Sequence, residues 1–142
     1  MVIAALALIG LFVATYLWLF KIGVIGQMSC AVGSCEVVNT SKWAILFGQP
    51  VAFWGVGFYV ATLTLALVGT TERFETDRRV TLALVALSGF GVLFSGWLTY
   101  LELAVIHAIC MYCVISAGLV VVIFWLSVLD LRGAPAGESA TE

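Results

Sequence analysis

Four long stretches of this chain are almost free of charged side chains. Residues 2–20, 51–71 and 109–129 contain none, and residues 80–105 contain only Glu102, close to their end. A helical span of the bilayer core needs roughly 20 apolar residues, and a helix satisfies its own backbone hydrogen bonds there. The sequence therefore predicts an all-α membrane protein, a four-transmembrane-helix bundle with an extracytoplasmic loop between helices 1 and 2.

The composition supports a single membrane domain. Hydrophobic residues make up 63% of the chain and charged residues only 10%, whereas soluble domains carry about 25% charged residues. A net charge of −2 gives no basis for nucleic-acid binding. We expect one domain over residues 1–129, with a retained anchor as its first span, because residues 1–20 lack the basic start of a signal peptide. Residues 130–142 are predicted to be a disordered cytoplasmic tail.

The distribution of lysine and arginine predicts the orientation. With four spans, both termini lie on the same side as the 70–79 loop. That side carries Arg73, Arg78, Arg79 and Arg132, whereas the other side carries Lys21 and Lys42. Cytoplasmic loops hold an excess of these residues. Both termini are therefore expected in the cytoplasm and the 21–49 connection outside.

The cysteines form two pairs at the outer membrane edge. Cys30 and Cys35 lie in the first connection, and Cys110 and Cys113 open the fourth span. The C-x-x-C spacing places both sulfurs on one helix face, and a helix N-terminus stabilises a thiolate. Disulfides persist on the outer side. Two adjacent pairs there indicate a relay that passes electrons by disulfide exchange.

Two other interpretations of the cysteines stay open. A non-catalytic membrane protein with structural disulfides would show the same pairs. The C-x4-C and C-x2-C spacings also fall within the range of structural zinc sites. An outer-face metal site would compete with oxidation of its thiols, so we predict no metal.

Other residues near the outer edge are candidates for the same chemistry. Glu102 and His107 flank the end of the third span, where an ionisable group is either functional or an interfacial marker; either side chain would supply protons to a reduced quinone. The Ser41 hydroxyl would steady a thiolate or a quinone carbonyl, or only cap a helix. Phe53, Trp54 and Phe58 would wall a flat aromatic ligand in the bundle.

A short surface helix is expected between the first cysteine pair and the second span. The apolar side chains within residues 43–47 would lay it on the membrane surface. Thr40 or Ser41 would cap its start and Gly48 would end it.

The order of these motifs resembles the vitamin K epoxide reductase family, specifically its bacterial homologues. The matching elements are Cys30-x4-Cys35, Ser41-Lys42-Trp43, Pro50, Gly55, Tyr100-Leu101-Glu102 and Cys110-x-Tyr112-Cys113. The resemblance covers about residues 2–129. Its most specific part is that the loop pair comes first and the C-x-x-C opens the last helix, an order that the bacterial DsbB-type oxidases do not share.

The resemblance implies a quinone-linked thiol oxidoreductase of the bacterial cytoplasmic (inner) membrane. Cys30 would meet an extracytoplasmic thioredoxin-like, DsbA-type protein, and Cys35 would attack the Cys110–Cys113 disulfide at Cys110. Cys113 would face ubiquinone or menaquinone, and its place in the first helical turn predicts thiolate character there. Many bacterial members carry a fused thioredoxin-like domain; this chain carries none, so its partner is expected to act in trans.

The resemblance also bears on the substrate. Vertebrate members carry an asparagine near the start of the second helix and a tyrosine one turn after the C-x-x-C. This chain has Val51 and Ala117 in those regions. We therefore expect quinone reduction without efficient epoxide reduction.

Overall fold

The computed structural model describes residues 1–27, 30, 33–71, 73 and 77–133. Within them, four helices are long and apolar enough to cross a membrane, which confirms the predicted all-α membrane class. The helices are α1 (Val2–Lys21), α3 (Val51–Gly69), α4 (Arg78–Tyr100) and α5 (Met111–Gly133). A π-helical segment, η2 (Leu101–Ile106), continues α4, so that the third span covers Arg78–Ile106.

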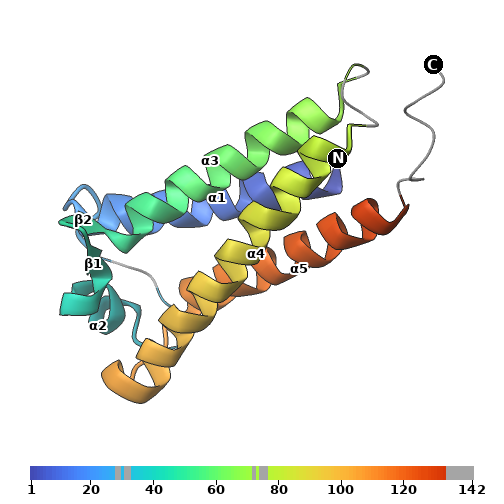
Figure 1. The fold of residues 1–142 in the computed structure, drawn as a ribbon. Coiled ribbons are helices and arrows are strands. Elements are labelled where there is room, and N and C mark those ends of the chain that lie inside the picture. The colour runs from blue at the N-terminus through green and yellow to red at the C-terminus, as the bar shows by residue number, and fades with distance from the viewer. Residues whose placement is uncertain (28–29, 31–32, 72, 74–76, 134–142) are drawn as a thin grey trace.

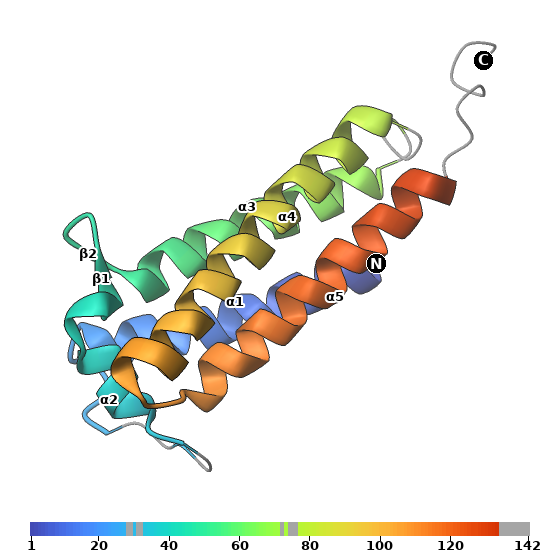
Figure 2. The ribbon, with the colours of Figure 1, turned by 60° about the horizontal axis from the view of Figure 1, so that its bottom comes forward.

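The four helices run side by side, and the α1–α3 and α4–α5 connections lie together at one end, called the loop end below (Figures 1 and 2). The start of α1, the end of α3, the start of α4 and the end of α5 meet at the other end. The loop end contains α2 (Cys35–Thr40), η2 and a small hairpin of β1 (Ile45–Leu46) and β2 (Gln49–Pro50). Both cysteine pairs therefore belong to this loop end.

Small residues let the helices approach closely. A Cβ atom added at Gly10 of α1 would overlap the ring of Tyr59 on α3. One added at Gly91 of α4 would lie 2.6 Å from Cζ of Phe58. Because helices in lipid associate by close packing rather than by a hydrophobic driving force, these two glycines fix how α3 sits between α1 and α4.

Buried hydroxyl groups are satisfied inside their own helices. Thr62, Ser88 and Ser127 are buried, and each donates a hydrogen bond to the carbonyl oxygen four residues earlier, at 2.9, 2.6 and 2.8 Å respectively. This back-bonding allows a hydroxyl to remain in an apolar bundle without an unpaired polar group.

The connection after α2 differs from the expected surface helix. A single 3-10 turn, η1 (Lys42–Ala44), is followed by the β1–β2 hairpin, so the prediction of a helix over residues 43–47 is wrong. Phe47 and Gly48 form the tip with φ angles of 52° and 76°. Pro50 disfavours a helical conformation for the residue before it, and Gly48 adopts the left-handed conformation without steric cost. Together these residues favour a turn.

The fourth span extends further than expected. α5 ends at Gly133, so residues 130–133, which we had assigned to a disordered tail, are helical. Leu131 continues the apolar pattern, and Arg132 lies in the last turn, where a cation interacts favourably with the helix dipole. The rest of the predicted tail, residues 134–142, lies outside the described residues.

Candidate active site

The C-x-x-C motif follows a sharp bend between η2 and α5. His107 takes a left-handed conformation with φ of 56°, and the Ala108 amide donates to the Glu102 carbonyl oxygen at 3.0 Å. The Glu102 carboxylate then accepts a hydrogen bond from the Cys110 amide at 3.1 Å. Only 4% of Glu102 is exposed. A carboxylate at a helix N-terminus satisfies free N–H groups, so Glu102 fixes the start of α5.

The loop that carries the first cysteine pair pairs with this bend. Gly33 forms an isolated antiparallel bridge with Cys110, and the Ser34 amide donates to the Ile109 carbonyl oxygen at 2.8 Å. Gly33 has a φ of +94°, and a Cβ there would collide with that same carbonyl oxygen. Glycine is therefore required at this position twice, for its backbone conformation and for the close approach.

The four cysteines gather in one apolar cluster that also contains Leu17 and Val38. Cys30 and Cys35 form a disulfide, whereas Cys110 and Cys113 are thiols. Cys35 and Cys110 are 1% and 0% exposed, and Cys30 and Cys113 are partly exposed. Each pair thus has one fully buried member, and the two buried members belong to the same cluster.

The Cys110 sulfur is surrounded by polar groups that act in opposite directions. A hydrogen bond from the Cys113 thiol lowers the pKa of Cys110 to about 7, against burial and the nearby Glu102 carboxylate, which raise it. This hydrogen bond favours the thiolate form of Cys110 when the pair is reduced. Thiolate character at Cys113 stays a prediction.

Asn39, which sequence reasoning missed, joins the two pairs. Its side chain is buried in α2 and donates to the Cys35 carbonyl oxygen at 2.9 Å and to the Cys110 sulfur at 3.7 Å. The Lys21 ammonium at the end of α1 donates to the Asn39 carbonyl oxygen at 2.8 Å. These bonds tie α2 both to α1 and to the C-x-x-C.

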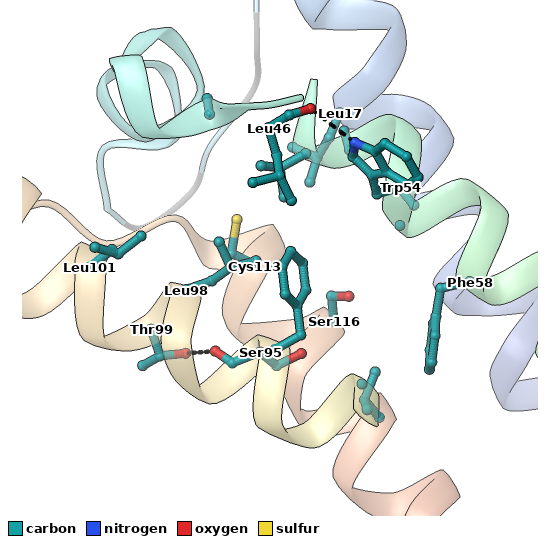
Figure 3. A pocket seen from close by; sticks show the side chains of 18 of the residues that line it. Leu17, Leu46, Trp54, Phe58, Ser95, Leu98, Thr99, Leu101, Cys113 and Ser116 are labelled. Atoms are coloured by element: carbon teal, nitrogen blue, oxygen red, sulfur yellow. Dashed lines mark hydrogen bonds between the residues drawn. The ribbon is translucent and has the colours of Figure 1, made fainter. Parts of the chain in front are cut away.

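A cavity of about 640 Å³ opens beside Cys113, between α3, α4 and α5 and below the hairpin (Figure 3). Its volume lies within the range of about 300–1,000 Å³ that is usual for small-molecule sites. Apolar side chains make up most of its wall, with Cys113 and the predicted residues Ser41, Trp54 and Glu102 among them. The Trp54 indole is held by a hydrogen bond to the Leu46 carbonyl oxygen at 3.1 Å.

Two of the predicted residues have other positions. Phe53 is not part of the cavity wall; its ring packs against Trp18 and Trp54 at centroid distances of 5.7 and 5.9 Å. A contact between Phe53 and a ligand in the bundle stays a prediction that this cavity does not support. His107 is exposed at the bend, away from the cavity wall. The Ser41 hydroxyl lines the cavity but donates to the Val38 carbonyl oxygen at 2.7 Å.

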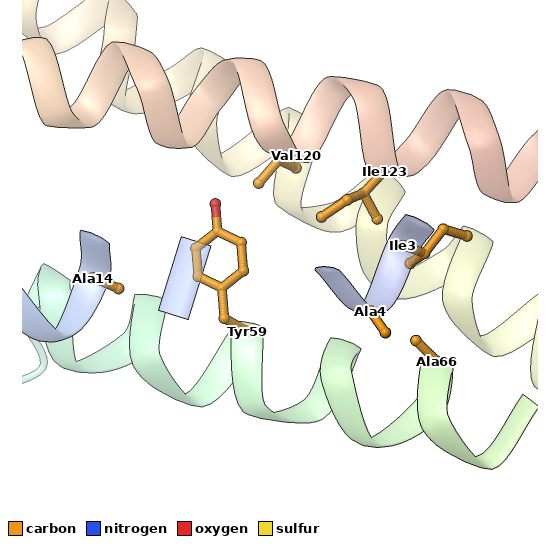
Figure 4. Packing of buried hydrophobic residues seen from close by; sticks show 7 residues of the cluster. All are labelled: Ile3, Ala4, Ala14, Tyr59, Ala66, Val120 and Ile123. Atoms are coloured by element: carbon orange, nitrogen blue, oxygen red, sulfur yellow. The ribbon is translucent and has the colours of Figure 1, made fainter. Parts of the chain in front are cut away.

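A pair of hydroxyl groups lies deeper in the same cavity. Tyr59 Oη and Ser116 Oγ are 2.7 Å apart, and Tyr59 also donates to the Ser116 carbonyl oxygen at 3.1 Å. The Tyr59 ring is packed in the apolar core with Val120 and Ile123 nearby (Figure 4). Ser116 lies three residues after Cys113, so the spacing alone puts both on one face of α5. The sequence could therefore have identified Ser116. It could not have identified Tyr59, which comes from a different helix, α3.

The residues present fit a flat aromatic ligand better than a metal. The cavity offers an apolar slot, a thiol at one end and hydroxyl groups at the other. Among the described residues, no group of three or more histidine, cysteine, aspartate or glutamate side chains is placed to hold a metal ion. The zinc alternative therefore receives no support from this part of the chain.

A comparison with known families agrees with this site. The family model described as the Vitamin K epoxide reductase family matches residues 1–128. That stretch includes all four cysteines, the bend at Glu102 and the cavity wall. Because the match spans most of the 142 residues, the chain belongs to the vitamin K epoxide reductase family and is an oxidoreductase.

Proposed function

We propose that this protein oxidises the dithiol of an extracytoplasmic thioredoxin-like, DsbA-type protein and delivers the electrons to a membrane quinone. The observation that carries the proposal is the order of exposure along the cysteines. Cys30 is partly exposed in the loop, Cys35 and Cys110 are buried together, and Cys113 lines the cavity. This order supports a path that begins at an aqueous partner and ends at a ligand in the bundle.

The electrons move by four successive exchanges of disulfide bonds. A thiolate of the partner attacks the Cys30–Cys35 disulfide at Cys30, and the partner's second thiol then displaces Cys30, which leaves the partner oxidised and the loop pair reduced. Cys35 next attacks the Cys110–Cys113 disulfide at Cys110 and frees Cys113. Cys30 finally attacks Cys35, so that the loop disulfide re-forms and both Cys110 and Cys113 are thiols, the state seen in this structure.

The reduced C-x-x-C then supplies two electrons to the quinone and returns to the disulfide. A quinone takes up two protons together with the two electrons and becomes a hydroquinone. The two protons equal in number those released when a dithiol becomes a disulfide, so the step balances. The direction is favourable when the quinone potential lies above that of the oxidase, about −120 mV for DsbA.

Glu102 is the side chain best placed to move these protons. Its carboxylate lines the cavity, is buried, and bonds to the Cys110 amide. An ionisable group at this depth in a membrane helix is a functional candidate by default. His107 lies five residues later and is exposed at the bend. We assign to it the exchange of protons with bulk water.

The same proposal includes an orientation and a location. We place the loop end outside the bacterial cytoplasmic membrane and both termini in the cytoplasm, because Arg78 and Arg79 start α4 at the opposite end. A membrane-impermeant thiol reagent applied to intact cells should label a single cysteine at position 30 and leave one introduced by Thr71→Cys unlabelled. Labelling of the second and protection of the first would reverse the orientation.

The cavity also bears on the choice of substrate. Val51 lines it and offers no polar group, but Tyr59 and Ser116 supply hydroxyl groups that the comparison with vertebrate members did not consider. These hydroxyl groups suit a ring carbonyl. We still propose that the protein reduces quinones in preference to the epoxide, because Val51 at the start of α3 gives the cavity no polar group there. Ala117 on α5 is not part of the cavity wall, so this preference rests on Val51.

The test is to assay the purified protein with a dithiol donor against ubiquinone, menaquinone and vitamin K epoxide separately. We expect turnover on at least one quinone and much slower turnover on the epoxide. Equal rates on the epoxide and the best quinone would contradict the substrate choice. A lack of turnover on either quinone, with an intact Cys30–Cys35 disulfide, would instead favour a structural role for the cysteines.

A further inference from the structure

The Asn39 amide lies between cysteines of different pairs. Its Nδ2 atom donates to the Cys35 carbonyl oxygen at 2.9 Å and to the Cys110 sulfur at 3.7 Å. A side-chain amide nitrogen carries two hydrogens, so one atom serves both partners at once. The side chain is only 8% exposed, and it belongs to the same helix as Cys35.

The orientation of this amide is determined by its surroundings. The Cys35 carbonyl can only accept a hydrogen bond, so it must face the nitrogen of Asn39 and not the oxygen. On the backbone side, the Lys21 ammonium holds the Asn39 carbonyl oxygen at 2.8 Å. Asn39 is therefore anchored at both ends, and its second N–H is directed at the Cys110 sulfur before any reaction begins.

We propose that Asn39 is a positioning residue that holds the Cys110 sulfur against Cys35 and stabilises negative charge on that sulfur. The proposal rests on the disulfide relay described above. It concerns the step in which Cys30 attacks Cys35 in the Cys35–Cys110 mixed disulfide. A Cys30–Cys35 bond forms, the Cys35–Cys110 bond breaks, and the electron pair leaves on Cys110, with no outside oxidant or reductant.

A fixed donor matters at Cys110 because this sulfur is fully buried, so water does not solvate the departing thiolate. Hydrogen bonds to a charged acceptor are stronger than neutral ones. The Cys113 thiol also donates to Cys110, but Cys113 is consumed whenever it delivers electrons. The amide of Asn39 keeps its hydrogens in every redox state of the relay.

Other titratable groups face the same sulfur and must be kept constant in a test. Cys113 and Tyr112 lie on α5, Glu102 lies on η2, and each interacts with Cys110. Lys21 on α1 reaches the backbone of Asn39. A change at Asn39 leaves all four in place, which makes the effect of the amide separable.

The first experiment measures the pH dependence of Cys110 alkylation. The host is the full chain with Cys30→Ser and Cys35→Ser, reduced, so that no exchange occurs. Iodoacetamide modification of Cys110 is followed by mass spectrometry. Limited access of the reagent to the buried sulfur slows the reaction by the same factor at every pH, so the midpoint still reports the pKa of Cys110. Asn39→Asp replaces the donor by a carboxylate of nearly the same shape and should raise the midpoint by about one pH unit or more. At pH values below the midpoint, the fraction of Cys110 present as thiolate should then be roughly tenfold lower.

A neighbouring substitution provides the control. The Thr40 hydroxyl bonds only within α2, to the Glu36 carbonyl at 2.6 Å and more weakly to the Val37 carbonyl, and is exposed. Thr40→Ala in the same host should leave the midpoint unchanged. Asn39→Leu, which removes the donor without adding a charge, should raise it less than Asn39→Asp does.

The second experiment measures positioning. In a Cys113→Ala chain that keeps the other three cysteines, the fraction of Cys35–Cys110 bridge is measured with and without Asn39→Leu. We expect several-fold less bridge with leucine. An unchanged midpoint in both Asn39 variants would overturn the proposal, even if bridging falls, because a merely structural side chain would act in that way. Neither readout involves a quinone, so a failure of quinone turnover would not be mistaken for a failure here.

Discussion

The Cys30–Cys35 pair belongs to the connection between α1 and α3, whereas Cys110 and Cys113 open the helix α5. The loop pair is joined as a disulfide and the helical pair is reduced. The loop pair is positioned by backbone pairing at Gly33 and Ser34, and the helical pair by the carboxylate of Glu102. Two different kinds of support therefore bring the pairs together.

The pairs also share one property, which explains how they work together. In each, one sulfur is buried in the common cluster and the other is partly exposed. Exchange between Cys35 and Cys110 is thereby shielded from water and from stray thiols. The partly exposed members have different surroundings. Cys30 lies in the loop, and Cys113 lines the apolar cavity. In the proposed relay, the direction comes from this asymmetry within each pair and not from the cysteines alone.

The largest effect should come from replacing Cys113, the partly exposed member of the helical pair. With Cys113→Ala, Cys110 cannot re-form its own disulfide, so the buried members should remain bridged to each other. Mass spectrometry without reduction should find the Cys35–Cys110 peptide pair. A chain that shows only Cys30–Cys35 and a free Cys110 would indicate that the loop disulfide is structural.

A smaller effect is expected from adding one methyl group where the loop meets the helical pair. Gly33→Ala combines a positive φ with a collision against the Ile109 carbonyl oxygen. We expect the Cys35–Cys110 bridge to form at least several-fold more slowly in the Cys113→Ala chain. Gly23→Ala is the matched control, because Gly23 also has a positive φ, of +85°, but has nothing within 4 Å.

That control separates strain from docking. A non-glycine residue in the left-handed region costs about 1–2 kcal/mol. Gly23→Ala should lose about that much stability in a thermal melt, and Gly33→Ala should lose more because of its collision. Only Gly33→Ala should also slow the bridge. Equal slowing in both would indicate that the loop conformation, and not its contact with the bend, controls exchange.

The pH dependence of the helical pair should come next in size. Because the Cys113 thiol lowers the pKa of Cys110 to about 7, the Cys110 thiolate is present above pH 7 and lost as the pH falls through that value. Its alkylation should therefore level off about 1.5 pH units below that of an ordinary cysteine, whose pKa is about 8.5. In the host with serine at positions 30 and 35, Cys113→Ala should move the midpoint upward. An unchanged midpoint would show that the Cys113 thiol is not the hydrogen-bond donor that lowers the pKa of Cys110.

The smallest effect is expected at the far end of the cavity. Ser116→Ala removes one hydroxyl from the pair with Tyr59, and the loss of a neutral hydrogen bond costs about 1 kcal/mol, roughly fivefold in the KM for the quinone. Ser88→Ala is the control, since Ser88 is a buried hydroxyl bonded within α4 and is not part of the cavity wall. Equal KM values for the two variants would place the quinone elsewhere.

The sequence predicted the parts of this molecule that depend on local composition. Four apolar runs specify four spans because lipid leaves no other solution for the backbone. The positions of Cys110 and Glu102 at one end of the bundle followed from where those runs end. The sequence did not show which of Phe53 and Phe58 faces the cavity. α3 is apolar on every side, so its pattern does not identify the face that points into the bundle. Only Phe58 lines the cavity.

The missed parts depend on contacts between distant segments. Asn39 lies 71 residues from Cys110, and Tyr59 lies 57 residues from Ser116. The importance of Gly33 comes from the carbonyl of Ile109 opposite it, which the sequence around Gly33 does not reveal. No local pattern encodes such pairs. The sequence could name the reactive cysteines but not the groups that hold them in position.

The most direct test of the relay follows the quinone itself. Purified protein with bound quinone is mixed with a dithiol donor, and the quinone absorbance is recorded in a single turnover for the unaltered chain and for Cys113→Ala. We predict that the absorbance falls as the hydroquinone forms in the first and stays constant in the second, which should instead accumulate the Cys35–Cys110 bridge. Equal loss of quinone absorbance in both would contradict the assignment of Cys113 as the residue that passes electrons to the quinone.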